Sequence, residues 1–143
     1  MKYELIIDPT GEERVVVYAR EENDFTREIE RLCEESRDDL LGYRDNEIVK
    51  LSAADIHYIS VIGGKVYAVC RDERFLLRER LYTLEKRLPD CFLRINQSCL
   101  ANIKKTERFD TSISGTLKIY FKNGHADYVS RRQLRAVKER LGL

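Results

Sequence analysis

The sequence contains few of the residues that carry metal or redox chemistry. It has 2 His and 4 Cys among 143 residues, and no two of the cysteines form a C-x-x-C pair. Structural zinc sites usually need such ligands at short, regular spacings. The sequence therefore predicts no metal site and no cofactor. It also predicts that Cys33, Cys70, Cys91 and Cys99 are small buried hydrophobic residues.

Long apolar runs are also missing. No stretch approaches the roughly 18 to 20 consecutive apolar residues that cross a bilayer as a helix. Acidic residues lie within a few positions of every apolar run in residues 1–20, so the N-terminus lacks the uncharged core of a signal peptide. We therefore expect a cytoplasmic protein that does not insert into a membrane.

Motifs of common enzymes are absent as well. The sequence has neither a G-x-x-x-x-G-K-[ST] phosphate loop nor a G-x-G-x-x-G turn. His57 lies inside an alternating apolar stretch with no Ser or Cys nucleophile nearby in a recognisable motif, which favours a structural histidine. We expect that the protein is not an enzyme.

Charge is abundant, and it is unevenly distributed. Residues 1–46 hold 7 Lys or Arg against 14 Asp or Glu, a net charge of −7, whereas the remainder holds 19 against 11, a net charge of +8. A basic block joined to an acidic one is typical of a chain in which one part meets a polyanion. Net charge can also serve solubility alone, so the positions of the basic residues must decide.

The acidic block is predicted to be a small ββα unit over residues 1–45. Two apolar runs, 3–8 and 14–19, flank a turn containing Pro9 and Gly11 and suggest a hairpin. Asn23 is a plausible N-cap for a helix whose apolar spacing continues to about Leu41, where Gly42 ends it. We expect this unit to act in dimerisation or partner docking.

The basic block, residues 46–143, is predicted to be a mainly β domain of the α+β class. A helix over 78–88 and a final helix after Ser130, which begins with a capping-box pattern to Gln133, accompany the strands. Gly63-Gly64 and Asn123-Gly124 predict tight hairpin turns. The predicted strands cover 48–51, 55–62, 66–71, 75–77, 92–96, 103–109, 116–121 and 126–129.

This order of elements resembles the LytTR family of bacterial DNA-binding domains. The resemblance covers about 95 residues and is most specific in the run FLRINQSCLANI, residues 92–103, where the family commonly reads F-x-R-I-H-R-S-x-x-V-N. Asn96, Gln97 and Ala101 depart from that form. The resemblance implies an elongated fold of ten strands whose loops enter successive major grooves of double-stranded DNA. It also implies a transcription regulator that binds promoter repeats, for which a homodimer is favoured.

Two groups of side chains are the strongest candidates for DNA contact. Asn96 and Gln97 follow a strand, and amide side chains suit the reading of adenine edges in the major groove. Arg131 and Arg132 lie in the first turn of the last helix, where they oppose the helix dipole unless an anion binds. In the family pattern, the position of Arg132 lies at the DNA surface.

Four further basic residues complete the predicted interface. Lys65 follows the Gly63-Gly64 turn, which corresponds to a loop that enters a groove in the family. Arg94 could serve DNA or a structural ion pair equally well. Lys104 and Lys105 suit contacts to the DNA backbone, although a solvated side chain is the simpler interpretation of Lys105.

Two alternatives to duplex DNA binding remain open. A basic β domain can also bind RNA by stacking bases on exposed aromatic residues, but the sequence has no Trp, and its Tyr and Phe residues lie mostly in strand-like runs. The protein could instead act only through protein contacts of the N-terminal unit.

Overall fold

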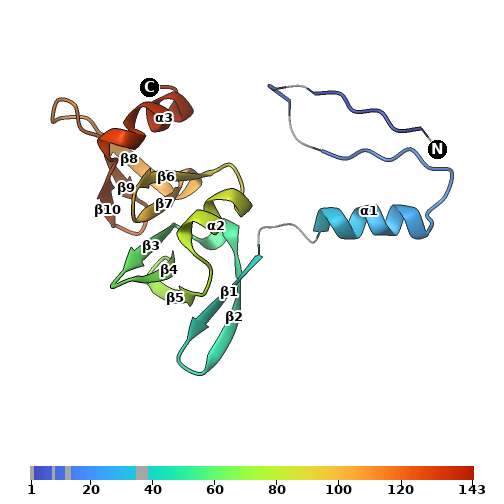
Figure 1. Ribbon diagram of the computed structural model, residues 1–143, viewed down its shortest axis with the longest axis horizontal. Helices are drawn as coiled ribbons and strands as arrows, with labels where there is room; N and C mark the ends of the chain where they lie inside the picture. Colours follow the sequence, from blue (N-terminus) through green and yellow to red (C-terminus); the bar gives the residue numbers. More distant parts are fainter. Residues whose placement is uncertain (1, 8, 12–13, 35–38) are drawn as a thin grey trace. The chain divides into compact units, whose positions relative to one another are not determined.

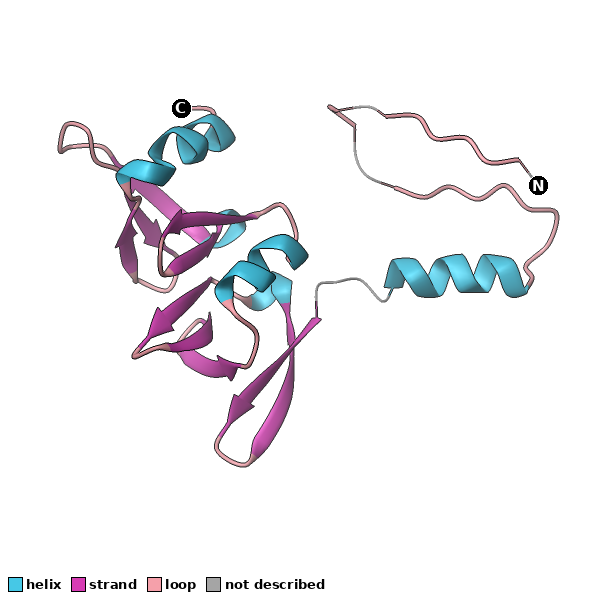
Figure 2. Cartoon of the chain, viewed as in Figure 1, coloured by secondary structure: helices cyan, strands magenta, loops and turns pink. Residues whose placement is uncertain are grey.

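The chain divides into two compact units, Met1–Ser36 and Arg37–Leu143, in a computed structural model that describes residues 2–7, 9–11, 14–34 and 39–143. In the described residues, the first unit contains one helix, α1 (Asp24–Glu34). The second unit contains ten strands and two α-helices (Figures 1 and 2). The predicted mainly β class is therefore confirmed for the basic part of the chain.

Helix α1 begins at the predicted cap but ends before the predicted residue. The Asn23 Oδ1 atom accepts a 3.0 Å hydrogen bond from the Thr26 N–H, and the Asn23 N–H donates to Thr26 Oγ1 at 2.9 Å. The helix ends at Glu34, whereas the sequence predicted an end near Leu41. Leu40 is 2% exposed in a strand of the second unit. Burial in that core outweighs the helical spacing.

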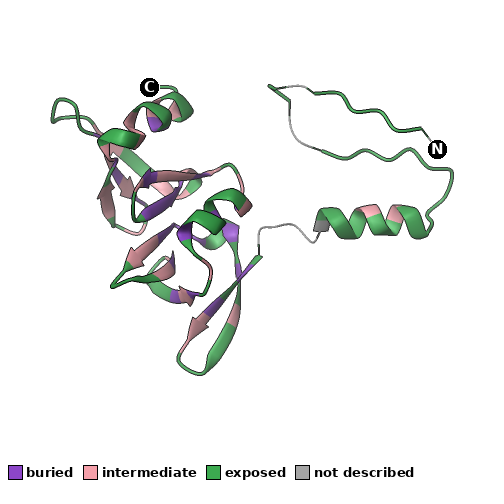
Figure 3. Cartoon of the chain, in the orientation of Figure 1, coloured by how far each residue is buried: buried purple, intermediate pink, exposed green. Residues whose placement is uncertain are grey.

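The N-terminal hairpin predicted over 3–8 and 14–19 is not present as paired strands among the described residues; Asp8 lies outside them. The apolar side chains of these runs are exposed: Tyr3 by 86%, Ile7 by 80% and Tyr18 by 96%. Figure 3 shows how little of this unit is buried. A two-stranded hairpin with no covering layer is marginal in water, because its apolar face has nothing to pack against.

All strands of the second unit pair antiparallel, in two sheets. The larger has the order β2-β1-β5-β4-β3-β7-β6 and the smaller the order β10-β9-β8. The larger sheet contains β1 (Asp39–Arg44), β2 (Glu47–Ser52), β3 (Tyr58–Ile62), β4 (Lys65–Cys70), β5 (Glu73–Leu77), β6 (Phe92–Asn96) and β7 (Cys99–Asn102). The smaller contains β8 (Thr106–Asp110), β9 (Lys118–Phe121) and β10 (Ala126–Tyr128). The helices are α2 (Leu81–Arg87) and α3 (Arg131–Leu141).

The sequence did not predict strands β1 and β7. β1 pairs with β2 over its whole length, so the second unit begins before the expected boundary at residue 46. β7 is buried at all four positions, and such a strand shows no alternation of apolar and polar residues. The predicted strand over 103–109 begins instead with a short 3-10 turn, Ile103–Lys105, and continues as β8.

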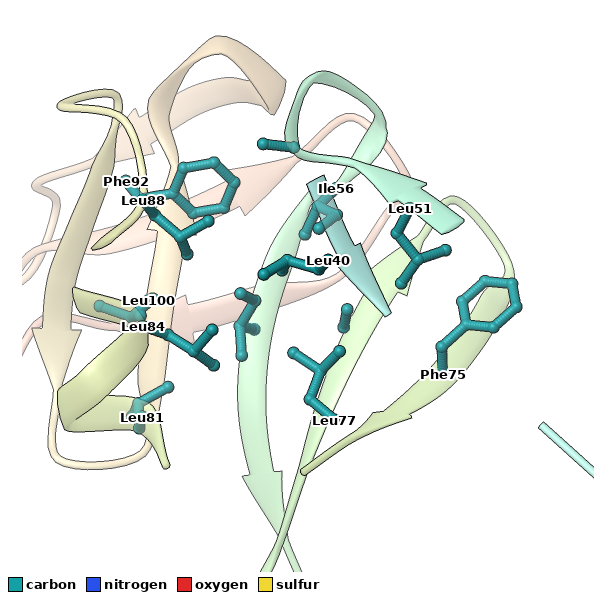
Figure 4. Packing of buried hydrophobic residues seen from close by; sticks show 13 residues of the cluster. Leu40, Leu51, Ile56, Phe75, Leu77, Leu81, Leu84, Leu88, Phe92 and Leu100 are labelled. Carbon is teal, nitrogen blue, oxygen red and sulfur yellow. The ribbon is translucent and has the colours of Figure 1, made fainter. Parts of the chain in front are cut away.

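Two hydrophobic cores lie on opposite sides of the β3–β7 strand pair. Ile59 and Leu100, which face each other in that pair, belong to the core beneath α2, shown in Figure 4. Tyr58 and Ala101, the next facing pair, belong to the core beneath the smaller sheet and α3. Alternation along two central strands therefore ties the two sheets together.

Candidate nucleic-acid interface

Two turns meet at one end of the larger sheet. β3 ends at Ile62 and returns as β4 at Lys65 through Gly63 and Gly64, whose φ angles of 58° and 77° confirm the predicted tight turn. The turn between β6 and β7 lies alongside, because the Val61 N–H donates a 2.8 Å hydrogen bond to the Ser98 carbonyl.

The start of α3 lies against the same β6–β7 turn. The Ser130 N–H donates to the Ile95 carbonyl at 2.8 Å, and Asn96 Nδ2 donates to the Tyr128 carbonyl at 2.9 Å. Three segments far apart in the sequence thus share one surface. We call it the loop face and define it as Gly63–Lys65, Gln97–Ser98 and Arg131–Arg132.

The loop face carries unneutralised positive charge. Lys65, Arg131 and Arg132 are exposed, and within the described parts of the chain none of them lies within 4.0 Å of a carboxylate in an ion pair. The first turn of α3 contains no acidic residue. The three cations are therefore available to an anionic partner.

The helix start at Ser130 leaves its N–H groups without a side-chain cap. α3 begins at Arg131 as predicted, but the predicted capping-box bonds are not formed: the Ser130 side chain makes no cap hydrogen bond. The Gln133 N–H instead donates to the Ser130 carbonyl at 3.0 Å. Uncapped N–H groups together with the positive end of the helix dipole favour a bound anion.

Arg94 and Asn96, two of the predicted contact residues, hold the β6–β7 turn. Arg94 donates to the carbonyls of Asn96 and Gln97 at 2.8 and 2.7 Å, and it pairs with Glu85 at 3.0 Å. The Asn96 amide accepts from the Ser98 N–H at 2.9 Å while it donates to Tyr128. Gln97 at the tip of the turn is exposed. Of the predicted amide pair, Gln97 presents its side chain outward.

Lys104 and Lys105 lie elsewhere. They follow β7, whose four residues span roughly 13 Å at about 3.3 Å per residue, so they lie at the opposite end of that strand from Gln97. The Lys104 N–H donates to Asn102 Oδ1, and the buried Asn102 amide also donates to the Ile56 carbonyl at 2.8 Å. The structure therefore brings Lys65, Gln97, Arg131 and Arg132 together and separates both lysines from them.

His57 and the cysteines lie outside the loop face. His57 is buried, its Nδ1 atom accepts the Arg71 N–H at 3.1 Å, and burial followed by the nearby charge of Lys105 lowers its pKa. Cys99 is buried, Cys70 and Cys91 are half-buried, and Cys33 is exposed on α1. The prediction that all four thiols are buried is thus wrong for Cys33, because the described residues of its unit form no core for α1 to pack against.

Comparison with known proteins identifies the fold and its family. Residues 46–142 match the family model described as the LytTr DNA-binding domain. The chain belongs to the LytTR family. Its second unit is accordingly a DNA-binding domain, and the family is one of DNA-binding domains rather than of enzymes.

Some relatives match the whole chain, so the similarity extends over the N-terminal unit as well. The LytTR protein is 34% identical over its full length to an uncharacterized HTH-type transcriptional regulator of Staphylococcus aureus strain bovine RF122 / ET3-1, covering 99% of that relative. It is 38% identical to another from strain NCTC 8325 / PS 47, covering 73% of this chain and 71% of that one. A solved LytTr DNA-binding domain from Bacillus cereus matches with a TM-score of 0.71 at 18% identity, covering 74% of this chain and 98% of that one.

The described helices of this LytTR protein form neither a helix-turn-helix motif nor a membrane span. α2 and α3 are separated by strands β6 to β10, so the described residues of the domain contain no consecutive pair of helices that could form a helix-turn-helix. Over the same described residues, no helix is long and apolar enough to cross a bilayer.

Proposed function

We propose that this LytTR protein regulates transcription through its loop face, which binds double-stranded promoter DNA in a sequence-specific manner. The observation that supports this most directly is the convergence of Lys65, Arg131 and Arg132 on one surface, where the described residues give them no acidic partner. Exposed cations that repel one another are maintained at a cost, and a phosphate backbone removes that cost.

Within the loop face, we assign base reading to Gln97 and Arg132. An amide can bond an adenine edge with a donor and an acceptor together, and a guanidinium can bond guanine through two donors. Arg131 and Lys65 are assigned to phosphates, with the first N–H groups of α3 completing the anion site. Arg94 and Asn96 act on DNA indirectly, because they fix the backbone on both sides of Gln97.

Binding of the full chain to a promoter fragment across a range of salt concentrations tests this function. Each phosphate neutralised lowers log affinity by about 0.9 per unit of log salt concentration, so the two phosphate contacts of Lys65 and Arg131 predict a slope of roughly −2 per protomer. A scrambled fragment should bind more weakly at every salt concentration. A flat salt response, or preferential binding of single-stranded RNA in competition with the duplex, would reject the proposal.

We further propose that the N-terminal unit makes a homodimer, so that two loop faces bind two repeats of the promoter. Its support is the exposed apolar surface of Tyr3, Ile7 and Tyr18, which is costly in water and suits a second copy of the same unit. Deletion of residues 1–36 should convert a dimer to a monomer in sedimentation experiments. An unchanged oligomeric state would reject this role and would favour docking of a different protein.

The same proposal has two simple corollaries. A protein that acts on promoter DNA works in the cytoplasm, where bacterial DNA lies. It also needs no catalytic group.

A further inference from the structure

A second basic site lies away from the loop face, at the other end of β3. A cavity of about 310 Å³ opens there, lined by Asp55, His57, Cys70, Arg71 and Lys105. Its volume is at the lower end of the range of roughly 300 to 1,000 Å³ for small-molecule sites. The cavity is therefore large enough for a small polar ligand and much too small for a protein segment.

Three basic residues surround this cavity. Arg71 and Lys105 line it, and Lys122 lies beside them, because its N–H donates to the Lys105 carbonyl at 2.9 Å. In the part of the chain that the structure describes, none of these three has a carboxylate within 4.0 Å. Their field reaches the cavity wall, since Lys105, Arg71 and Lys122 all lower the pKa of His57.

Arg71 is held in place at a conformational cost. Its φ angle is 57°, in the left-handed region that favours glycine. Both of its backbone polar groups are tied to side chains: its N–H donates to His57 Nδ1 at 3.1 Å, and its carbonyl accepts from Asn123 Nδ2 at 2.9 Å. A strained residue that its neighbours fix on both sides is a common feature of binding sites.

We propose that this cavity binds a phosphate-type oxyanion between Arg71, Lys105 and Lys122. The three cations supply the charge, and Arg71 can donate two parallel hydrogen bonds to two phosphate oxygens. Asp55, the acidic residue of the wall, can accept a hydrogen bond from a protonated oxygen. The site therefore prefers hydrogen phosphate or a phosphate monoester over sulfate, which has no proton to donate.

The phosphate group could come from a free metabolite or from the DNA backbone. A free phosphate ester bound here would be an input signal for a regulator whose DNA contacts lie at the opposite end of β3. A backbone phosphodiester bound here would extend the DNA footprint beyond the loop face through the cations alone, because it has no protonated oxygen to donate to Asp55. Both sources use the same cations, and they differ in whether DNA affinity depends on the site.

Inorganic phosphate, titrated into the full-length protein at constant ionic strength maintained with chloride, tests the proposal. Saturable shifts are expected in the backbone NMR signals of Arg71, Lys105 and Asn123, with weaker binding of sulfate. Arg71→Gly is the decisive variant, because glycine adopts the φ angle of 57° without strain and the fold should be retained or stabilised. It should lower phosphate affinity at least tenfold.

Asp45→Gly provides a matched control. Asp45 also has a positive φ, 52°, but it lies in the turn between β1 and β2, away from the cavity. It should leave phosphate affinity unchanged. The proposal is overturned if phosphate produces no saturable shift beyond that of chloride, if Arg71→Gly binds phosphate as the unmodified protein does, or if sulfate binds as tightly as phosphate.

A DNA titration of the same variants separates the two sources. If the phosphate belongs to DNA, Lys105→Gln with Lys122→Gln lowers DNA affinity and reduces the salt slope. If it belongs to a free ester, the double variant loses phosphate binding and binds DNA normally. Failure of the anion site would leave binding through Arg132 intact, so it is distinguishable from failure of the proposed DNA contacts.

Discussion

The backbone N–H of Ser130 donates a 2.8 Å hydrogen bond to the carbonyl of Ile95. This bond joins the residue before α3 to the next-to-last residue of β6, two positions before Gln97, so Arg132 and Gln97 are fixed on one surface by main-chain geometry. Ile95 itself is fully buried, which anchors the joint in the core beneath α3. Because substitutions of exposed side chains leave this joint intact, the contribution of each contact to DNA binding can be measured separately.

Arg132→Ala should weaken promoter binding by about 1 to 3 kcal/mol. If Arg132 reads guanine, the substitution should weaken binding most for fragments that contain that guanine. Fragments in which another base replaces the guanine should bind the variant and the unmodified protein equally. If Arg132 binds phosphate, the loss should be even across sequences, and the salt slope should fall by about 1. Arg135→Ala on the same helix, 93% exposed and paired with Glu139, is the control in fluorescence anisotropy titrations. Equal affinities of Arg132→Ala and the unmodified protein would exclude both roles.

Asn96→Ala and Gln97→Ala should separate positioning from reading. Asn96→Ala removes the hydrogen bonds to Tyr128 and Ser98, so thermal unfolding should show a stability loss of about 1 to 2 kcal/mol, and DNA affinity should fall for all sequences. Gln97→Ala should leave stability unchanged, because the side chain is exposed, and should alter base preference alone. The opposite pattern in the two variants would assign the reading role to Asn96.

The sequence predicted the DNA-binding domain well because its strongest signals are local. Gly63-Gly64 needs positive φ angles, and Ser130 precedes the last helix; both features follow from a few adjacent residues. The order of these elements in turn carried the resemblance to the LytTR family. The grouping of Gln97 with Arg132 could not be read from spacing, since it depends on hydrogen bonds between distant strands.

The differences between the sequence prediction and the structure come from long-range packing, and they leave the DNA contacts predicted for Lys104 and Lys105 as predictions. Leu40 and Leu41 continue a helical apolar pattern, but pairing of β1 with β2 places Leu40 in the core. Lys104 and Lys105 are close in sequence to Asn96 and Gln97, yet the antiparallel return along β7 puts them at the other end of the sheet. For Arg94 the sequence left a DNA contact and a structural ion pair equally open, because an exposed arginine and one that braces a turn have the same sequence signature; in the structure Arg94 pairs with Glu85 at 3.0 Å.

Thiol labelling should distinguish Cys33 from Cys70 and Cys99. Burial raises the pKa of Cys70 to about 11 and raises that of Cys99 further, so neither forms much thiolate near neutral pH. At about pH 8, iodoacetamide should therefore modify the exposed Cys33 well before Cys70 or Cys99, as peptide mass spectrometry would show. Denaturant should remove the difference. Rapid labelling of Cys99 in the folded protein would contradict the described core.

Strand β1 should be essential to the DNA-binding domain, although the family match begins after it. A protein that begins at Asp39 keeps Leu40 in the core that also contains Leu51 and Phe75, whereas one that begins at Glu47 lacks β1 and uncovers part of that core. Loss of a buried leucine alone costs about 2 to 5 kcal/mol, so only the longer protein should unfold cooperatively on heating. Equal melting temperatures of the two truncations would show that β1 contributes nothing to the core.

A point substitution tests the same packing in the full-length protein. A Cβ atom at Gly42 would lie 2.6 Å from Leu51 Cδ1 and 2.7 Å from Phe75 Cβ, so Gly42→Ala forces the β1 backbone away from the core. Such overpacking should lower the free energy of unfolding by about 1 to 3 kcal/mol. Lys50→Ala, at an exposed position of the neighbouring strand β2, should change it by less than about 0.5 kcal/mol. Because Gly42 lies outside the loop face, the folded fraction of Gly42→Ala should still bind DNA normally. A stability equal to that of Lys50→Ala would mean that β1 does not pack against Leu51 and Phe75 in solution.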